Sequence, residues 1–158
     1  MFGDGDNGWL QDLRHRHFPP ERNQVPAHLT LFHHLPPGVE RELGQRLAHY
    51  TASAPPQARI TGILNLGRGT AFRVDSEELA DIRDDLADAF QGLLIPQDQA
   101  RWRSHITIQN KVEPKEAKAL QAQLQATFEP RSLDVKGLAS WRYQGGPWQK
   151  IREHLFRG

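Results

Sequence analysis

Two short stretches of the chain alternate strictly between polar and apolar positions. They are His28-Leu29-Thr30-Leu31 and His105-Ile106-Thr107-Ile108. Alternation with a period of two is typical of a half-buried β-strand, in which residues i and i+2 share one face. Each stretch therefore predicts a strand, over about 27–34 and about 104–111, whose histidine and threonine point to the same side.

Helices and further strands follow from the spacing of the other apolar residues. Val39, Leu43 and Leu47 recur at helical spacing and predict a helix over 38–52, and a second apolar stripe predicts a helix over 76–91. Residues 1–8 are rich in glycine and aspartate and are expected to form turns. The other expected elements are a short helix at 9–17, a hairpin of strands 58–66 and 70–75, a helix from 114, a strand over 132–143 and a last strand over about 147–154.

The order of these elements is the same in the two halves of the chain. Each half runs from a motif strand through a proline, a helix and another proline to a strand, a glycine turn and a second strand. Such self-similarity indicates an internal repeat. We therefore expect a single bilobal domain over 1–158, with halves of about 1–96 and about 97–158, each giving one histidine and one threonine to a shared site.

Composition narrows the class of protein. The 158 residues, of which 25% are charged and 37% hydrophobic, are typical of one globular domain. The formal net charge of +1 favours contact with RNA ends or small nucleotides over a long polyanion. The chain has no cysteine, which excludes disulfides and thiolate metal sites, and no apolar run approaches the ~20 residues of a membrane span. We expect a cytoplasmic monomer that does not associate with membranes.

Two histidines and two threonines on one face suit phosphoryl transfer. Histidine can act as an acid or a base near neutral pH without a large pKa shift. One imidazole would take a proton from the incoming oxygen and the other would give one to the leaving oxygen, while threonine hydroxyls donate to the non-bridging oxygens. A strained cyclic phosphodiester needs neither a metal nor another cofactor for this reaction. The sequence leaves open which histidine is the acid, and the roles exchange between hydrolysis and ligation.

The two motifs resemble the 2H phosphoesterase superfamily, and within it the bacterial 2′-5′ RNA ligase-like branch. The resemblance rests on His28-Leu29-Thr30-Leu31 and His105-Ile106-Thr107-Ile108 with their flanks, Pro26-Ala27 and Gln109-Asn110. It extends from about Trp9 to the last strand. It implies an α+β, bilobal fold in which two pseudo-twofold-related units, with antiparallel sheets flanked by helices, enclose a central cleft.

The resemblance also implies an activity. His28 and His105 would be the catalytic pair, and Thr30 and Thr107 would bind phosphate, in metal-independent action on 2′,3′-cyclic phosphates or 2′-5′ linkages at RNA ends. Such proteins usually open with a long apolar strand, of which only Met1-Phe2 could be left here. Either the start is truncated or misassigned, or the first lobe lacks that strand and exposes a sheet edge.

Residues that flank the motifs are candidates for substrate contacts. Strand parity places Phe32 and His34 with His28, and Gln109 and Lys111 with His105. An aromatic ring could stack on a base and basic side chains could meet phosphates, while packing or a solvated edge is the alternative in each case. The candidate residues are Phe32, His34, Arg101, Arg103, Gln109 and Lys111.

Other aromatic and histidine residues are expected to have structural roles. Tyr143 and Trp148, near the last turn, are expected to be packing residues. The pairs His33-His34 and His15/His17 match no carboxylate spacing of a metal site and are expected at the surface or at strand ends. No metal site is therefore predicted.

Two rival functions remain open. One is hydrolysis of a small nucleotide on the same scaffold, such as an ADP-ribose cyclic phosphate. The other is a non-catalytic protein that binds RNA ends, although a binder does not need paired proton-transfer groups. Turnover of a 2′,3′-cyclic mononucleotide in the presence of chelator would separate an enzyme from a binder.

Overall fold

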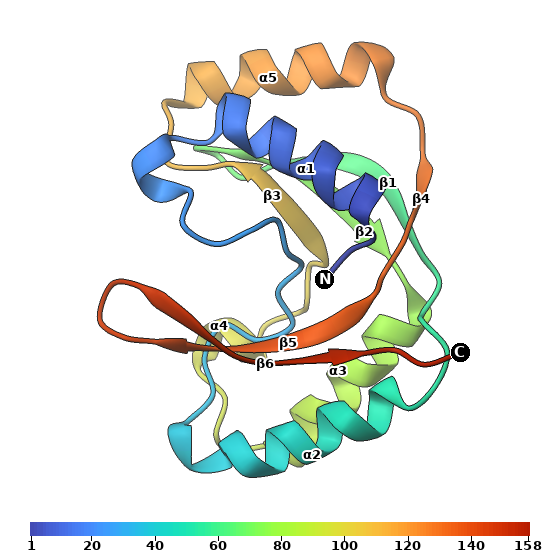
Figure 1. Cartoon of the computed structure of the whole chain (residues 1–158). Coiled ribbons are helices and arrows are strands. Elements are labelled where there is room, and N and C mark those ends of the chain that lie inside the picture. Colours follow the sequence, from blue (N-terminus) through green and yellow to red (C-terminus); the bar gives the residue numbers. More distant parts are fainter.

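Two separate antiparallel sheets form the framework of the computed structural model, which describes residues 1–158 (Figure 1). The larger sheet has the strand order β3-β2-β1-β4, and the smaller one is the hairpin β5-β6. The strands are β1 (Ala58–Asn65), β2 (Thr70–Asp75), β3 (His105–Gln109), β4 (Arg131–Leu133), β5 (Gly137–Tyr143) and β6 (Trp148–Leu155). The expected α+β fold with antiparallel sheets flanked by helices is confirmed.

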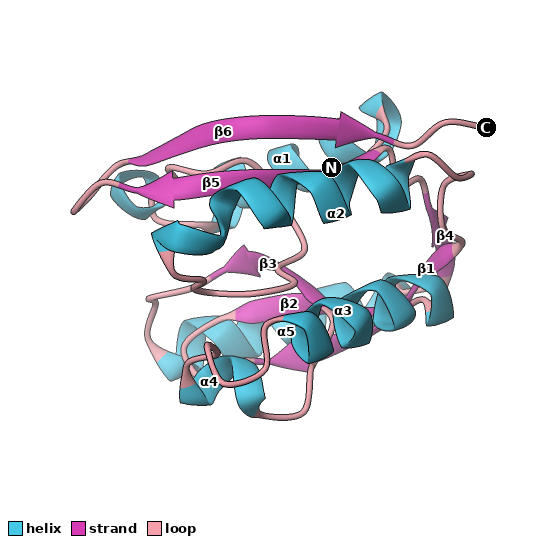
Figure 2. Cartoon of the chain, turned by 90° about the horizontal axis from the view of Figure 1, so that it is seen from below, coloured by secondary structure: helices cyan, strands magenta, loops and turns pink.

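Each sheet is covered by its own helices. α1 and α5 pack on the larger sheet, and α2 packs on the β5-β6 hairpin, so that two layers face each other in Figure 2. None of the helices combines the length and apolar character that crossing a membrane requires. The helices are α1 (Asp4–His17), α2 (Glu40–Thr51), α3 (Glu77–Ala89), α4 (Pro96–Gln99) and α5 (Pro114–Thr127), with single 3-10 turns at Pro20–Arg22 and Pro37–Val39.

The β1-β2 hairpin forms where the glycine turn predicts it. Gly67 adopts a positive φ of 84° in the turn, a conformation that glycine reaches without strain. Gly69 is needed for a different reason, because a Cβ there would overlap the carbonyl oxygen of Gln109. The turn therefore lets the end of β3 approach closely, and both predicted strands of this hairpin are confirmed to within a residue.

One face of the larger sheet makes the core. Phe72 and Ile106 on that face are almost completely buried, and the Phe72 ring stacks on Trp9 of α1 with centroids 5.1 Å apart. Since side chains alternate along a strand, the neighbours of Ile106 in the chain, His105 and Thr107, must lie on the opposite face. The position of the core thus sets the side on which the second motif is displayed.

The start of the chain differs from the prediction of turns over residues 1–8. α1 begins at Asp4 instead, where carboxylates in the first turn favour the positive end of the helix dipole. Asp6 accepts hydrogen bonds from Arg131 (2.6 Å) and from the backbone N–H of Asp134 (2.7 Å). These partners lie far along the sequence, so the local composition could not reveal them.

Two of the expected strands are also wrong. The segment 27–34 is irregular, with bends at Leu31 and His33 and a single antiparallel bridge between Leu29 and Ile106. The expected strand over 132–143 is split into β4 and β5, because the chain passes from one sheet to the other there. Val135 in this crossing forms an isolated bridge with Phe2, which is all that corresponds to a first strand.

Candidate active site

Both motif histidines have the same local hydrogen bond. The Nδ1–H of His28 donates to the carbonyl of Pro26 at 2.7 Å, and the Nδ1–H of His105 donates to the carbonyl of Arg103 at 2.5 Å. Each ring is therefore held by the carbonyl two residues before it. Because a carbonyl only accepts, this bond fixes the tautomer and leaves Nε2 of each ring available for proton transfer.

The bridge between Leu29 and Ile106 brings the two motifs side by side. In an antiparallel pair, this register sets His28 opposite Thr107 and Thr30 opposite His105. Opposed residues point to the same face, so the four polar side chains share one face and the two aliphatic ones share the other. Neither threonine hydroxyl has a hydrogen-bond partner within the protein, and neither is a buried unsatisfied group.

His28 lies in a positive and partly desolvated environment. Burial is the main cause that lowers the pKa of His28; the bond to Pro26 opposes it, and Arg14, the Met1 amino group and His105 lower the pKa further. The side chain is nevertheless exposed to solvent. The ring is therefore surrounded by enough protein to lower its pKa and is still accessible to water.

A buried arginine connects the two motif segments. The side chain of Arg14, only 3% exposed, comes from α1. Its guanidinium donates to the carbonyls of Thr107 (2.7 Å) and Val25 (2.9 Å) and to Oδ1 of Asn23 (3.0 Å). Arg14 thus links the segment that precedes the first motif to the backbone of the second motif.

The first motif is held from its other end by α3 and the segment around α4. The buried Arg83 donates to the carbonyls of Leu31 (3.2 Å) and Asp98 (2.6 Å). The carboxylate of Asp98 accepts the backbone N–H groups of His33 (2.9 Å) and His34 (3.1 Å), and also Nδ1–H of His33 (2.9 Å). Burial alone would raise the pKa of Asp98, but these hydrogen bonds outweigh it and lower the pKa.

Comparison with known proteins shows the family and the fold of the chain. The family model described as the 2′-5′ RNA ligase superfamily matches residues 3–147. The chain belongs to this superfamily. Its fold is also that of a solved protein, TT0787 of Thermus thermophilus, with a TM-score of 0.61 and 15% identity over 99% of this chain and 94% of that one. No curated protein sequence matches the chain significantly.

The basic residues that flank the second motif of this superfamily member are free. Arg101, Arg103 and Lys111 are exposed, and no hydrogen bond or ion pair engages their charged ends. Lys111 also has a positive φ of 61°, which places it at a sharp change of direction just after β3. These three side chains remain candidates for phosphate contacts.

Of the other three flanking candidates, Gln109 lies on a different face from the predicted one, and Phe32 and His34 lie where the chain bends. The bends at Leu31 and His33 end the alternation that grouped Phe32 and His34 with His28, and the Phe32 ring packs under the Arg83 guanidinium at 4.4 Å. Gln109 is 2% exposed and accepts a hydrogen bond from Thr70 at 2.9 Å. A bulge opposite Thr70 and Ala71 turns it inward, so the face predicted for Gln109 is wrong.

Sequence reasoning missed Arg73. This exposed residue of β2 lies directly opposite His105 in the ladder, on the same face and with Cβ atoms on the order of 5 Å apart. Its Nε donates to Oγ1 of Thr61 at 3.1 Å, and its guanidinium lies over Gly62. Only the pairing of β2 with β3 reveals this neighbour, and nothing near Arg73 in the sequence signals it.

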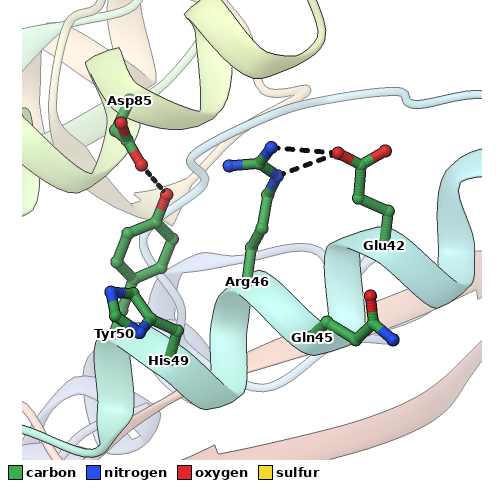
Figure 3. A pocket seen from close by; sticks show the side chains of 6 residues that line it. All are labelled: Glu42, Gln45, Arg46, His49, Tyr50 and Asp85. Atoms are coloured by element: carbon green, nitrogen blue, oxygen red, sulfur yellow. Dashed lines mark hydrogen bonds and ion pairs between the residues drawn. The ribbon is translucent and has the colours of Figure 1, made fainter.

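A surface hollow of about 350 Å³ lies elsewhere, between α2 and α3 (Figure 3). The polar groups that line it bind one another: Arg46 forms an ion pair with Glu42 at 3.0 Å, and the Tyr50 hydroxyl donates to Asp85. Burial and the bond to Asp85 raise the pKa of Tyr50 to about 12. No group of three or more histidine, aspartate or glutamate side chains is close enough to hold a metal ion, here or elsewhere in the chain.

Proposed function

We propose that this superfamily member is a metal-independent phosphoesterase acting on 2′,3′-cyclic phosphate or 2′-5′ linkages at RNA ends. One observation carries the proposal: two histidines with the same Nδ1–carbonyl bond, each beside an unpaired threonine hydroxyl, meet on one face of the Leu29–Ile106 bridge. An acid, a base and two hydroxyl donors around one phosphate are what in-line displacement requires. We expect the protein to act as a monomer in the cytoplasm.

In hydrolysis, we assign the base to His28. Its pKa is lowered by burial and by the neighbouring positive groups Arg14, the Met1 amino group and His105, so a larger fraction of its rings is neutral at neutral pH. His28 takes a proton from water as the water oxygen attacks phosphorus. The bond from phosphorus to one ribose oxygen breaks, and protonated His105 gives that oxygen a proton. In ligation the two roles exchange.

The threonines and the unpaired basic residues stabilise the negative charge of the substrate's phosphates. The hydroxyls of Thr30 and Thr107 donate to the non-bridging phosphoryl oxygens, whose negative charge persists through the displacement. Arg101, Arg103 and Lys111 bind neighbouring phosphates, and their lack of protein partners supports this role. Arg73 joins them on the face of His105.

Turnover of 2′,3′-cyclic AMP in excess EDTA tests the proposal. We expect wild type to hydrolyse it, His28→Ala and His105→Ala to lose most of the rate, and His49→Ala, on α2, to match wild type. Binding of a phosphate-ended RNA without turnover would favour the binding protein instead. Turnover of an ADP-ribose cyclic phosphate in place of an RNA end would favour the small-nucleotide enzyme. Activity lost in chelator and restored by a divalent ion would contradict the metal-independent mechanism.

A further inference from the structure

Two large aromatic side chains are exposed at the end of the β5-β6 hairpin. Tyr143 is 58% exposed and Trp148 is 43% exposed. They are direct partners in the ladder, with ring centroids 5.0 Å apart and planes inclined by 48°. The expectation that they are packing residues is wrong, because they pack on each other rather than into the core.

These rings belong to one face of the hairpin, and that face carries no helix. Trp141 pairs with Lys150 and Tyr143 with Trp148, and alternation places all four side chains on the same side. The Lys150 ammonium lies over the Trp141 ring at 5.4 Å. Arg142, between the aromatic positions, points to the other side, where it pairs with Glu40 of α2 at 2.6 Å. We call Trp141, Tyr143, Trp148 and Lys150 the aromatic face.

Charge distinguishes this hairpin from the rest of the chain. The hairpin, residues 137–155, contains one acidic residue, Glu153, and three basic residues, a net charge of +2. The whole chain has a net charge of +1, so the remaining residues are net negative. The basic residues are Arg142, which pairs with Glu40, Lys150, which pairs with Glu153, and Arg152, which has no ion pair.

The aromatic face is on the side of the hairpin that looks toward the motifs. In Figure 1 the hairpin runs between α2 and the level of β3, and its turn projects beyond the helices. Because α2 covers one side, the aromatic side is turned toward the larger sheet. The Met1 amino group supports this proximity: it donates to the carbonyl of Gly137 of β5 at 3.0 Å, and it is one of the positive groups that lower the pKa of His28.

We propose that the aromatic face binds single-stranded RNA, stacking bases upstream of the reacting end while Lys150 on the same face meets a phosphate. Stacking suits every base, since each has a π-face, and basic residues beside aromatic ones suit a single strand. The inference rests on the proposed function and narrows its substrate: an RNA strand fits this surface, whereas a mononucleotide held at the histidines leaves it empty. A protein partner lacks the matching negative phosphates.

Two variants with matched conservative changes test this. Trp148→Ala and Tyr143→Ala should each weaken binding of a fluorescein-labelled six-nucleotide RNA with a 3′-phosphate by roughly 5- to 100-fold, measured by fluorescence anisotropy. Trp148→Phe and Tyr143→Phe should keep most of the affinity. Leu93→Ala, which also removes an exposed apolar side chain (45% exposed), should match wild type. All these side chains are at the surface, and unchanged thermal unfolding would verify the fold.

Kinetics give a second and separate readout. For a six-nucleotide RNA with a 2′,3′-cyclic phosphate, KM should rise in the alanine variants while kcat changes little. Both constants for 2′,3′-cyclic AMP should stay at wild-type values. Equal RNA affinity in wild type and Trp148→Ala would overturn the inference, as would a wild-type dimer that Trp148→Ala converts to a monomer without any loss of RNA binding. The anisotropy needs no turnover, so an inactive protein whose RNA binding depends on Trp148 would refute the proposed catalysis and not the aromatic face.

Discussion

The two motif segments share a sequence pattern but are supported in different ways. β3 belongs to a backbone ladder with β2 that runs from Arg73 opposite His105 to Thr70 opposite Gln109, with one bulge. The first segment has one bridge to β3, and side chains bind several of its other backbone groups. Trp102 donates to the carbonyl of Thr30 at 3.0 Å, and Gln11 accepts from the N–H of Ala27 at 2.9 Å.

This difference indicates where each motif is vulnerable. A ladder distributes its support over many backbone groups, which a side-chain substitution other than proline leaves in place. The first segment depends on a few buried polar side chains, above all Arg83 and Asp98. Removing one of these leaves its partners buried and unpaired, which costs more than the hydrogen bond itself contributes. The same histidine geometry can therefore be fragile in one motif and robust in the other.

The largest expected effect is the loss of either motif histidine, and it should be similar in the two motifs. His28→Ala or His105→Ala should each lower kcat for a 2′,3′-cyclic phosphate by ~10²–10⁴-fold, because each removes a proton-transfer group. The double variant should be far less than multiplicatively worse, since both groups act on one displacement. Steady-state kinetics would check this. Full activity in His28→Ala would mean that the first motif is structural.

Next in size is the loss of a hydroxyl donor. Thr30→Val and Thr107→Val keep the side-chain shape and remove one donor to the phosphoryl oxygens, which should cost up to ~10²–10³-fold in kcat. A larger loss of kcat in one variant would show that its hydroxyl stabilises more of the phosphoryl charge. Unchanged unfolding in urea serves as the control, and wild-type kcat in both variants would remove the threonines from the mechanism.

Asp98→Ala tests the support of the first motif alone. We expect the free energy of unfolding to fall by ~1–3 kcal/mol, because the N–H groups of His33 and His34 lose their acceptor, and kcat to fall as His28 loses its position. Asp98→Asn, which keeps one carbonyl oxygen, should rescue part of both. Asp84→Ala, an exposed carboxylate of α3, is the matched control. A stable and fully active Asp98→Ala would show that Asp98 does not position the first motif.

The pKa values make a prediction about pH. Because the pKa of His28 is lowered, the acidic limb of kcat/KM should have its midpoint below the ordinary histidine value of about 6.5, and His28→Ala should lose that limb. The unfolded chain binds the proton more readily, so stability is fully present above about pH 6.5 and declines as pH falls toward the lowered pKa. Urea unfolding across this range, compared between wild type and His28→Ala, measures the second effect. If the acidic limb of kcat/KM persists in His28→Ala, that limb arises from another titrating group.

Arg73 gives the smallest expected effect. Arg73→Gln should raise KM for an RNA end only several-fold, with little change in kcat, because Arg73 is exposed and solvent screening reduces its charge-assisted hydrogen bond well below the full ~1.5–3 kcal/mol. Arg41→Gln, an exposed arginine of α2 without a partner, controls for the lost charge. Equal KM in both variants would place Arg73 outside the substrate site.

Much of this protein is determined by local sequence. The apolar spacing over 38–52 and 76–91 matches α2 and α3, and the glycine turn between β1 and β2 matches the hairpin. These elements depend on periodicity and turn chemistry within a few residues. The paired His-x-Thr motifs also sufficed to indicate the superfamily by resemblance, and the family model confirms it.

Only the tertiary structure decided which side chains meet. Arg73 opposes His105 through the pairing of β2 with β3, and Gln109 turns inward at a bulge that its own sequence does not mark. The first motif is no regular strand because Arg83, Asp98 and Trp102, far away along the chain, take its backbone groups. Trp148 is exposed because no other element packs against its face. Such contacts depend on the pairing of distant segments, and a periodicity of two or 3.6 residues carries no information about that pairing.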